Sequence, residues 1–111
     1  MAGNVILILG GTREAIEIAC DLEQIENTTV ITSLAGVTRS PRLPTGKVRF
    51  GGFGGKDGLF DYLIREKITL VVDATHPFAE KITKNASEAS ERANIPFLHF
   101  SRKPWKETTQ D

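Results

Sequence analysis

Two adjacent glycines and a threonine are the first residues in this chain whose types and spacing could do chemistry. Gly10, Gly11 and Thr12 directly follow the aliphatic run 5–9, and an apolar stripe with helical spacing begins just after them. Free backbone N–H groups at the start of a helix, together with the positive end of its dipole, can hold a phosphate. Thr12 could cap this helix and also hydrogen-bond a phosphate oxygen. The full G-x-G-x-x-G fingerprint is absent, because Thr12 stands at its second glycine, so a tight turn with an ordinary cap explains the segment equally well.

The end of the second expected strand indicates which dinucleotide would suit such a site. Sites that prefer NAD usually carry Asp or Glu there, which binds the ribose 2′-hydroxyl. This chain has Thr32 and Ser33 instead, with Arg39 and Arg42 close behind. A hydroxyl donor, nearby guanidinium groups and the lack of a carboxylate suit a 2′-phosphate and favour NADP(H), with NAD(H) as the alternative. The two arginines could also simply face solvent.

Two later segments place small or polar residues after further strands. Residues 51–55 contain four glycines, which would let a ligand approach the backbone closely, although a merely flexible loop has the same composition. Asp73 ends a buried run and needs partners there, most simply backbone N–H groups of the next loop. His76 precedes Pro77, so its backbone is extended and the strand must stop. A lone histidine is more often structural than catalytic. Because His76 follows a strand at the edge where ligands bind, a functional role is easier to accept for it than for a lone histidine elsewhere.

The spacing of the hydrophobic residues, with glycines and prolines between the apolar segments, predicts the strands and helices that position these residues. The expected strands are 5–9, 29–32, 47–50, 70–73 and 97–100. The expected helices are 13–24, one that begins at an Asp57 cap, and a long one with an apolar face over 79–93. This alternation predicts an α/β fold, a Rossmann-like three-layer αβα domain with a five-stranded, mostly parallel sheet of order 3-2-1-4-5. We expect this NADP(H)-binding domain to cover residues 1–101 and a polar tail to cover residues 102–111.

In an open parallel sheet, ligands bind outside the carboxyl ends of the strands, so the groups described above should gather at one edge. No catalytic or metal-binding residue is assigned from the sequence. The candidate cofactor-binding residues are Gly10, Gly11, Thr12, Arg13, Glu14, Ser33, Leu34, Ala35, Thr38, Arg39, Gly51, Gly52, Asp73, Ala74, Thr75, His76 and Pro77.

Length, charge and cysteine content bound the function. A chain of 111 residues allows one domain, and a single cysteine, Cys20, excludes an internal disulfide. The net charge is zero, but residues 27–56 hold five basic residues, six glycines and no acid, which indicates a local anion site or a solvated loop. Neutrality overall argues against nucleic acid as a partner. The aliphatic run 5–9 is too short to cross a membrane and no basic segment precedes it, so we expect a soluble, cytoplasmic domain.

Five ordered segments resemble the precorrin-6A reductase family over residues 4–105. They are GGTREA at 10–15, SLAG at 33–36, VRFGGFGG at 48–55, DATHPFA at 73–79 and RKPW at 102–105. The resemblance implies an oxidoreductase of the cobalamin (vitamin B12) pathway. Such an enzyme takes hydride from NADPH, or from NADH in some cobalt-dependent versions, and reduces one ring double bond of precorrin-6A or cobalt-precorrin-6A.

The resemblance also implies roles for individual residues and a partner. Gly10, Gly11, Thr12, Ser33 and Arg39 would serve the adenosine and phosphates, and Gly52, Thr75, His76 and Pro77 would lie nearer the nicotinamide. Family members are longer and enclose the tetrapyrrole substrate between two lobes, of which this chain matches the first. Two readings therefore stay open, the cofactor-binding lobe of such a reductase and a stand-alone NADP(H)-binding module without catalysis. A short-chain dehydrogenase is disfavoured, because its Tyr-x-x-x-Lys motif would need lysine where Glu66 follows Tyr62.

Overall fold

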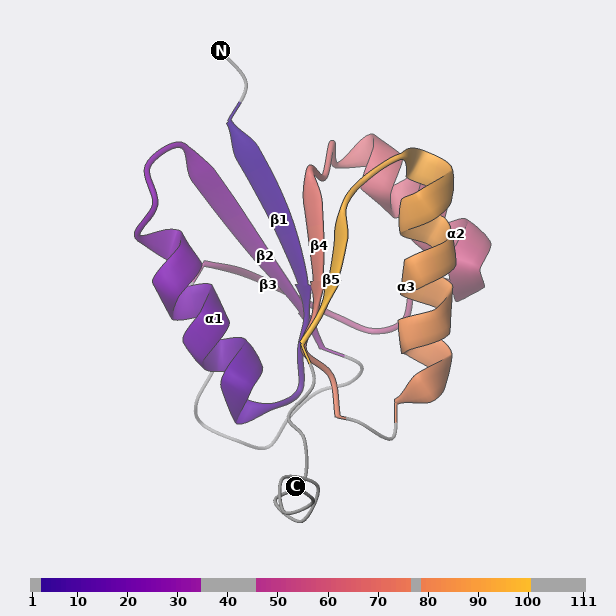
Figure 1. Cartoon of the computed structure of the whole chain (residues 1–111), viewed down its shortest axis with the longest axis horizontal. Helices are drawn as coiled ribbons and strands as arrows, with labels where there is room; N and C mark the ends of the chain where they lie inside the picture. Colours follow the sequence, from indigo (N-terminus) through magenta and orange to yellow (C-terminus); the bar gives the residue numbers. More distant parts are fainter. Residues whose placement is uncertain (1–2, 35–45, 77–78, 101–111) are drawn as a thin grey trace, which may run out of the picture.

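A computed structural model describes residues 3–34, 46–76 and 79–100 of the chain. It contains a five-stranded sheet of order β3-β2-β1-β4-β5, and every neighbouring pair of strands is parallel (Figure 1). The predicted fold class and strand order are therefore confirmed. In chain order the elements are β1 (Asn4–Leu9), α1 (Arg13–Glu23), β2 (Thr28–Leu34), β3 (Lys47–Phe50), α2 (Gly55–Arg65), β4 (Leu70–Asp73), α3 (Glu80–Ala93) and β5 (Phe97–His99).

The sheet is covered on both faces, α1 on one and α2 with α3 on the other (Figure 1). Successive residues of a strand point to opposite faces, and β1 follows this rule with apolar residues on both sides. Ile6 and Ile8 pack in the core beneath α1, whereas Leu7 and Leu9 pack in the core beneath α2 and α3. Burial on both faces explains why β1 is a continuous aliphatic run.

The helix α2 begins before Asp57, which corrects the expected cap. Its cap residue is Gly54, whose φ of 89° lies in the left-handed region that glycine enters without strain. Asp57 lies in the first turn of α2, and its carboxylate accepts a 3.0 Å hydrogen bond from the Arg92 guanidinium of α3. The side chain that was expected to cap the helix therefore pairs with a neighbouring helix.

The strand β2 extends further than the sequence indicated, and this extension matters for the site. Hydrogen bonding to β3 continues the strand to Leu34, with Ser33 paired in register with Arg49. Ser33 is therefore the second-last residue of β2, and its side chain lies on the same face of the sheet as that of Arg49. A serine that was expected to begin a loop is instead held rigidly by the sheet.

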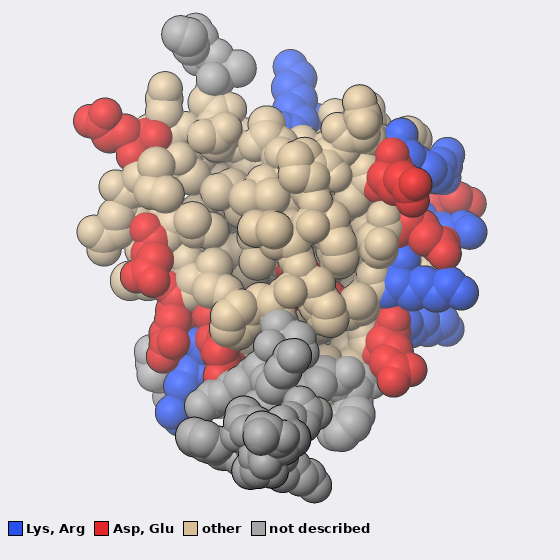
Figure 2. Space-filling view, in the orientation of Figure 1, with Lys and Arg blue, Asp and Glu red and all other residues tan. Residues whose placement is uncertain are grey.

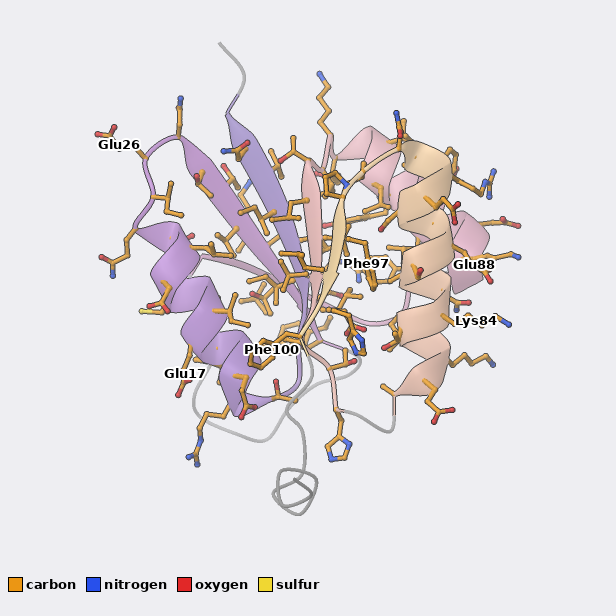
Figure 3. The ribbon with its side chains drawn as sticks, in the orientation of Figure 1. Glu17, Glu26, Lys84, Glu88, Phe97 and Phe100 are labelled. Atoms are coloured by element: carbon orange, nitrogen blue, oxygen red, sulfur yellow. The ribbon has the colours of Figure 1, made fainter. Side chains whose placement is uncertain are left out.

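An apolar groove runs between α1 and the β5 edge of the sheet. It is lined by Ile18, Leu22, Leu70, Val72, Leu98, His99 and Phe100. Figure 3 shows Phe97 directed toward α3 and Phe100 directed toward α1, and Leu98 and Phe100 are exposed. Figure 2 shows this middle region free of charged side chains, with carboxylates over α1 and charges of both signs over α3. None of the described helices is long and apolar enough to cross a membrane.

Candidate functional site

A cavity of about 230 Å³ lies at the carboxyl ends of the first strands. Its walls come from the β1–α1 turn, the end of β2, the loops after β3 and β4, and the start of α3. The lining residues are Leu9, Gly10, Gly11, Ser33, Gly51, Gly52, Phe53, Thr75, His76, Ala79 and Ile82. Seven of the predicted cofactor-binding residues are therefore brought together, from four segments far apart in the sequence.

The β1–α1 turn presents backbone to this cavity. Gly11 has a φ of 111°, and a Cβ added there would meet no atom within 4 Å. Gly10 is packed closely, since an added Cβ would lie 2.9 Å from the Cγ2 atom of Thr32 on β2. The first glycine thus permits tight packing of the turn on the sheet, and the second leaves the backbone open to a ligand.

Thr12 caps α1 as the sequence predicted. Its Oγ1 accepts a 3.1 Å hydrogen bond from the Ala15 N–H and donates a 2.6 Å hydrogen bond to the carbonyl oxygen of Ala74 after β4. In this structure the single hydrogen of the hydroxyl is donated to Ala74, and a contact between Thr12 and a phosphate stays a prediction. Its observed role is to tie the turn after β1 to the end of β4.

Arg49 on β3 is a residue of this site that the sequence analysis did not single out. Its guanidinium donates to Ser33 Oγ at 2.8 Å and to the carbonyl oxygens of Gly51 and Gly52 at 3.1 and 3.2 Å. The same guanidinium lies over the ring of Phe53, with its carbon 4.0 Å from the ring centroid. It therefore joins the end of β2 to the glycine loop that follows β3. The lack of acids over 27–56 was the available signal, but the pairing with Ser33 depends on strand register.

Tyr62 on α2 lies beside this arginine. Its ring makes an edge-to-face contact with Phe53, and the Arg49 guanidinium carbon is 5.1 Å from its centroid. Burial raises the pKa of the Tyr62 hydroxyl, and the positive charge of Arg49 partly opposes that rise. The aromatic pair forms the floor on which the guanidinium rests.

Asp73 ends β4 with a completely buried carboxylate. One oxygen accepts from the Thr75 N–H at 3.1 Å and from Thr75 Oγ1 at 2.6 Å, and the other accepts from Thr83 of α3. His99 on β5 places Nε2 3.7 Å from the same carboxylate. The expected loop N–H partner is present, and Asp73 orients Thr75 from behind the cavity wall. Thr83 and His99 were not anticipated, because both reach Asp73 only through the packing of α3 and β5.

The remaining predicted residues fall into two groups. The first group is described but does not line the cavity, and it consists of Arg13, Glu14, Leu34, Asp73 and Ala74. Leu34 and Ala74 are buried, and Arg13 is exposed on α1. Four predicted site residues lie outside the described part of the chain, namely Ala35, Thr38, Arg39 and Pro77. Arg42 and the segment 102–105 also lie outside it.

Comparison with known proteins identifies the family. The sequence profile of the family described as "Precorrin-6x reductase CbiJ/CobK" matches residues 5–111. The chain belongs to this precorrin-6x reductase family. A precorrin-6A reductase from Rhodococcus erythropolis is 49% identical over 100 residues, which cover 90% of this chain and 40% of that protein. A cobalt-precorrin-6A reductase from Priestia megaterium is 31% identical over 101 residues, 88% of this chain and 38% of that protein.

A solved structure agrees with this membership of the precorrin-6x reductase family. The structure described as "CobK precorrin-6A reductase" superposes with a TM-score of 0.84 and 41% sequence identity. The alignment covers 92% of this chain and 40% of that one. The chain thus spans about 40% of the length of the relatives that it matches.

Proposed function

We propose that this chain is the amino-terminal, cofactor-binding lobe of an NAD(P)H-dependent precorrin-6A reductase. The observation that carries the proposal is the cavity at the carboxyl ends of the strands, where the backbone at Gly11, Gly51 and Gly52 is open to a ligand. Positive φ at Gly11 and Gly51 and the absence of a side chain allow a phosphate to approach backbone N–H groups. The residues present therefore fit a dinucleotide phosphate.

Different parts of the cofactor would bind at different positions along the carboxyl edge of the sheet. The turn at Gly10 and Gly11, with the positive end of α1, holds the phosphates, and Ser33 with Arg39 serves the adenosine side. Gly52, Thr75, His76 and Pro77 serve the nicotinamide side. When bound, the cofactor supplies the hydride. The chain orients the nicotinamide ring, and the packed apolar residues Phe53, Ala79 and Ile82 exclude water from it.

The substrate class is a corrin precursor, and the relatives favour the cobalt-free form. Five precorrin-6A reductases are 42–49% identical to this chain over 100 residues. The two cobalt-precorrin-6A reductases that match over about 100 residues are 31% and 29% identical. Precorrin-6A is therefore the proposed substrate, with reduction of one ring double bond as the reaction in cobalamin biosynthesis. In this proposal residues 1–101 form the cofactor lobe, 102–111 lead toward a second lobe that binds the tetrapyrrole, and the protein is soluble and cytoplasmic.

Isothermal titration with NADPH and NADH tests the cofactor assignment. Gly11→Ala adds a methyl group at the cavity wall and should weaken NADPH binding on the order of tenfold or more, because the backbone can no longer be approached closely. Gly55→Ala is the matched control, since Gly55 also has positive φ, an added Cβ there would meet no atom within 4 Å, and the residue does not line the cavity. Both variants carry similar backbone strain, so equal effects on binding would count against the site.

A stand-alone NADP(H)-binding module without catalysis is the second candidate. It would bind the cofactor in the same way and would show the same response to Gly11→Ala. The two candidates differ in whether the chain supports turnover when the rest of a reductase is supplied.

A further inference from the structure

The Arg49 guanidinium is a half-buried positive charge surrounded by neutral acceptors. Its described hydrogen-bond partners are a hydroxyl and two carbonyl oxygens, and none is a carboxylate. Two other described arginines differ: Arg92 pairs with Asp57 at 3.0 Å and Arg65 with Glu66 at 3.5 Å. A cation that has no carboxylate among its hydrogen-bond partners in the described part of the chain can attract an anion to its vicinity.

Ser33 connects this charge to the cavity. The residue is only 6% exposed, and it lines the cavity at the carboxyl end of β2. Its Oγ accepts the hydrogen bond from Arg49, so the hydrogen of its own hydroxyl is directed elsewhere. None of the described residues that line the cavity is Asp or Glu. A hydroxyl donor backed by a guanidinium in such a wall suits an anionic oxygen.

The carbonyl groups of the glycine loop also leave the site favourable for an anion. An exposed carbonyl oxygen would repel an anion, but those of Gly51 and Gly52 accept hydrogen bonds from Arg49. The guanidinium also rests on the ring of Phe53, which limits its rotation. Arg49 therefore shapes the loop and supplies charge from one fixed position.

We propose that Ser33 and Arg49 form the subsite for the 2′-phosphate of NADP(H). Ser33 donates its hydroxyl to the phosphate, and Arg49 provides the compensating charge directly behind Ser33 and the Gly51–Gly52 backbone. The end of β2 is where dinucleotide-binding sheets meet the ribose 2′ position. This inference rests on the proposed dinucleotide binding and assigns to Arg49 the part that the sequence alone gave to Arg39.

The test uses two small probes that differ in one group, adenosine 2′,5′-bisphosphate and AMP. The wild-type chain should bind the bisphosphate more tightly than AMP. Arg49→Met keeps the side-chain length but removes the charge, and should reduce that preference on the order of tenfold while AMP binding stays the same. Arg49→Lys should restore part of the preference, and Ser33→Ala should lower it by a smaller factor.

Arg65→Met is the matched control, because Arg65 also lies against the Tyr62 ring but is exposed and outside the cavity. It should leave both affinities unchanged. Arg39→Met completes the set. If Arg39→Met removes the preference and Arg49→Met does not, the subsite proposal is overturned.

The failure of this inference is distinguishable from that of the proposed function. If neither probe nor NADPH binds the wild-type chain, dinucleotide binding itself is wrong and the subsite falls with it. If both probes bind wild type equally, or if Arg49→Met weakens both by the same factor, the cofactor site stands and the 2′-phosphate assignment is wrong. Melting curves identify a variant that does not fold, and Ser33→Ala then decides, because it alters a single oxygen.

Discussion

Tyr62 is the single tyrosine of the chain and reports directly on its surroundings. Because burial raises the pKa of its hydroxyl more than Arg49 lowers it, Tyr62 should titrate above the ordinary tyrosine value of about 10. Removal of the opposing charge in Arg49→Met should raise the pKa further. Ultraviolet absorbance of tyrosinate during an alkaline titration measures both values, and an identical pKa in wild type and Arg49→Met would contradict the contact.

The same shift has a defined sign for stability. A group whose pKa is higher in the folded state favours folding only while it stays protonated. The contribution of Tyr62 is therefore complete below the unfolded-state pKa and disappears as the pH rises through the folded-state value. Tyr62→Phe should make the free energy of unfolding less dependent on pH in that alkaline window.

His76 is exposed and lines the cavity, so a ligand bound there would lie beside it, and its side chain contributes little to the core. His76→Ala should weaken NADPH binding or alter its geometry while leaving the melting temperature nearly unchanged. A melting curve recorded beside a cofactor titration separates the two effects. A large loss of stability together with unchanged binding would show that His76 is structural.

At the scale of the elements, Thr12 joins two of them that are distant in sequence. Thr12→Val keeps the shape of the side chain but leaves the Ala15 N–H and the Ala74 carbonyl without their partner. Loss of a helix cap costs about 0.5–2 kcal/mol, so we expect a destabilisation of about 1–2 kcal/mol in urea unfolding.

Thr12→Ser is the control for this prediction because it retains the hydroxyl and both hydrogen bonds. It should unfold close to the wild-type midpoint. Equal stability of the serine and valine variants would mean that packing of the γ-methyl group, and not the two hydrogen bonds, is what Thr12 contributes.

The strands β1 and β4 were predictable from the sequence because most of their residues are apolar and buried. β1 and β4 show this directly, since apolar runs ending at Leu9 and Asp73 became adjacent parallel strands. The start of α2 was not predictable, because Asp57 pairs with Arg92, which is 35 positions away. The Arg49–Ser33 contact was not predictable either, because it also joins residues that are distant in sequence and depends on the register of β2 against β3.

The candidate site also contains parts that could be predicted from the sequence and parts that could not. Glycine turns such as Gly10-Gly11 carry their function in the backbone, so their role could be inferred from residue type alone. The support behind the cavity wall is built by side chains from other elements, as Thr83 of α3 and His99 of β5 show at Asp73. Such contacts depend on tertiary packing and leave no local pattern in the sequence.

At the scale of the whole molecule, the cavity is small relative to the proposed reaction. Its volume of about 230 Å³ is below the usual range of roughly 300–1,000 Å³ for small-molecule sites. It can hold a part of a dinucleotide, and a tetrapyrrole must be held by further surface. The chain covers about 40% of the length of its relatives, so the proposed reaction requires additional polypeptide to position the substrate.

The 111-residue chain alone should therefore bind NADPH but show negligible reductase activity. Hydride transfer needs the acceptor carbon at contact distance from the nicotinamide, and such positioning supplies a large part of an enzymatic rate. Spectrophotometric assay with precorrin-6A should detect NADPH oxidation only when the remaining segment of the Rhodococcus erythropolis relative is fused or co-expressed. The same fusion carrying Gly11→Ala should be inactive at low NADPH. Robust turnover by the chain alone would overturn the two-lobe proposal, whereas tight NADPH binding by an inactive but folded fusion would favour the stand-alone binding module.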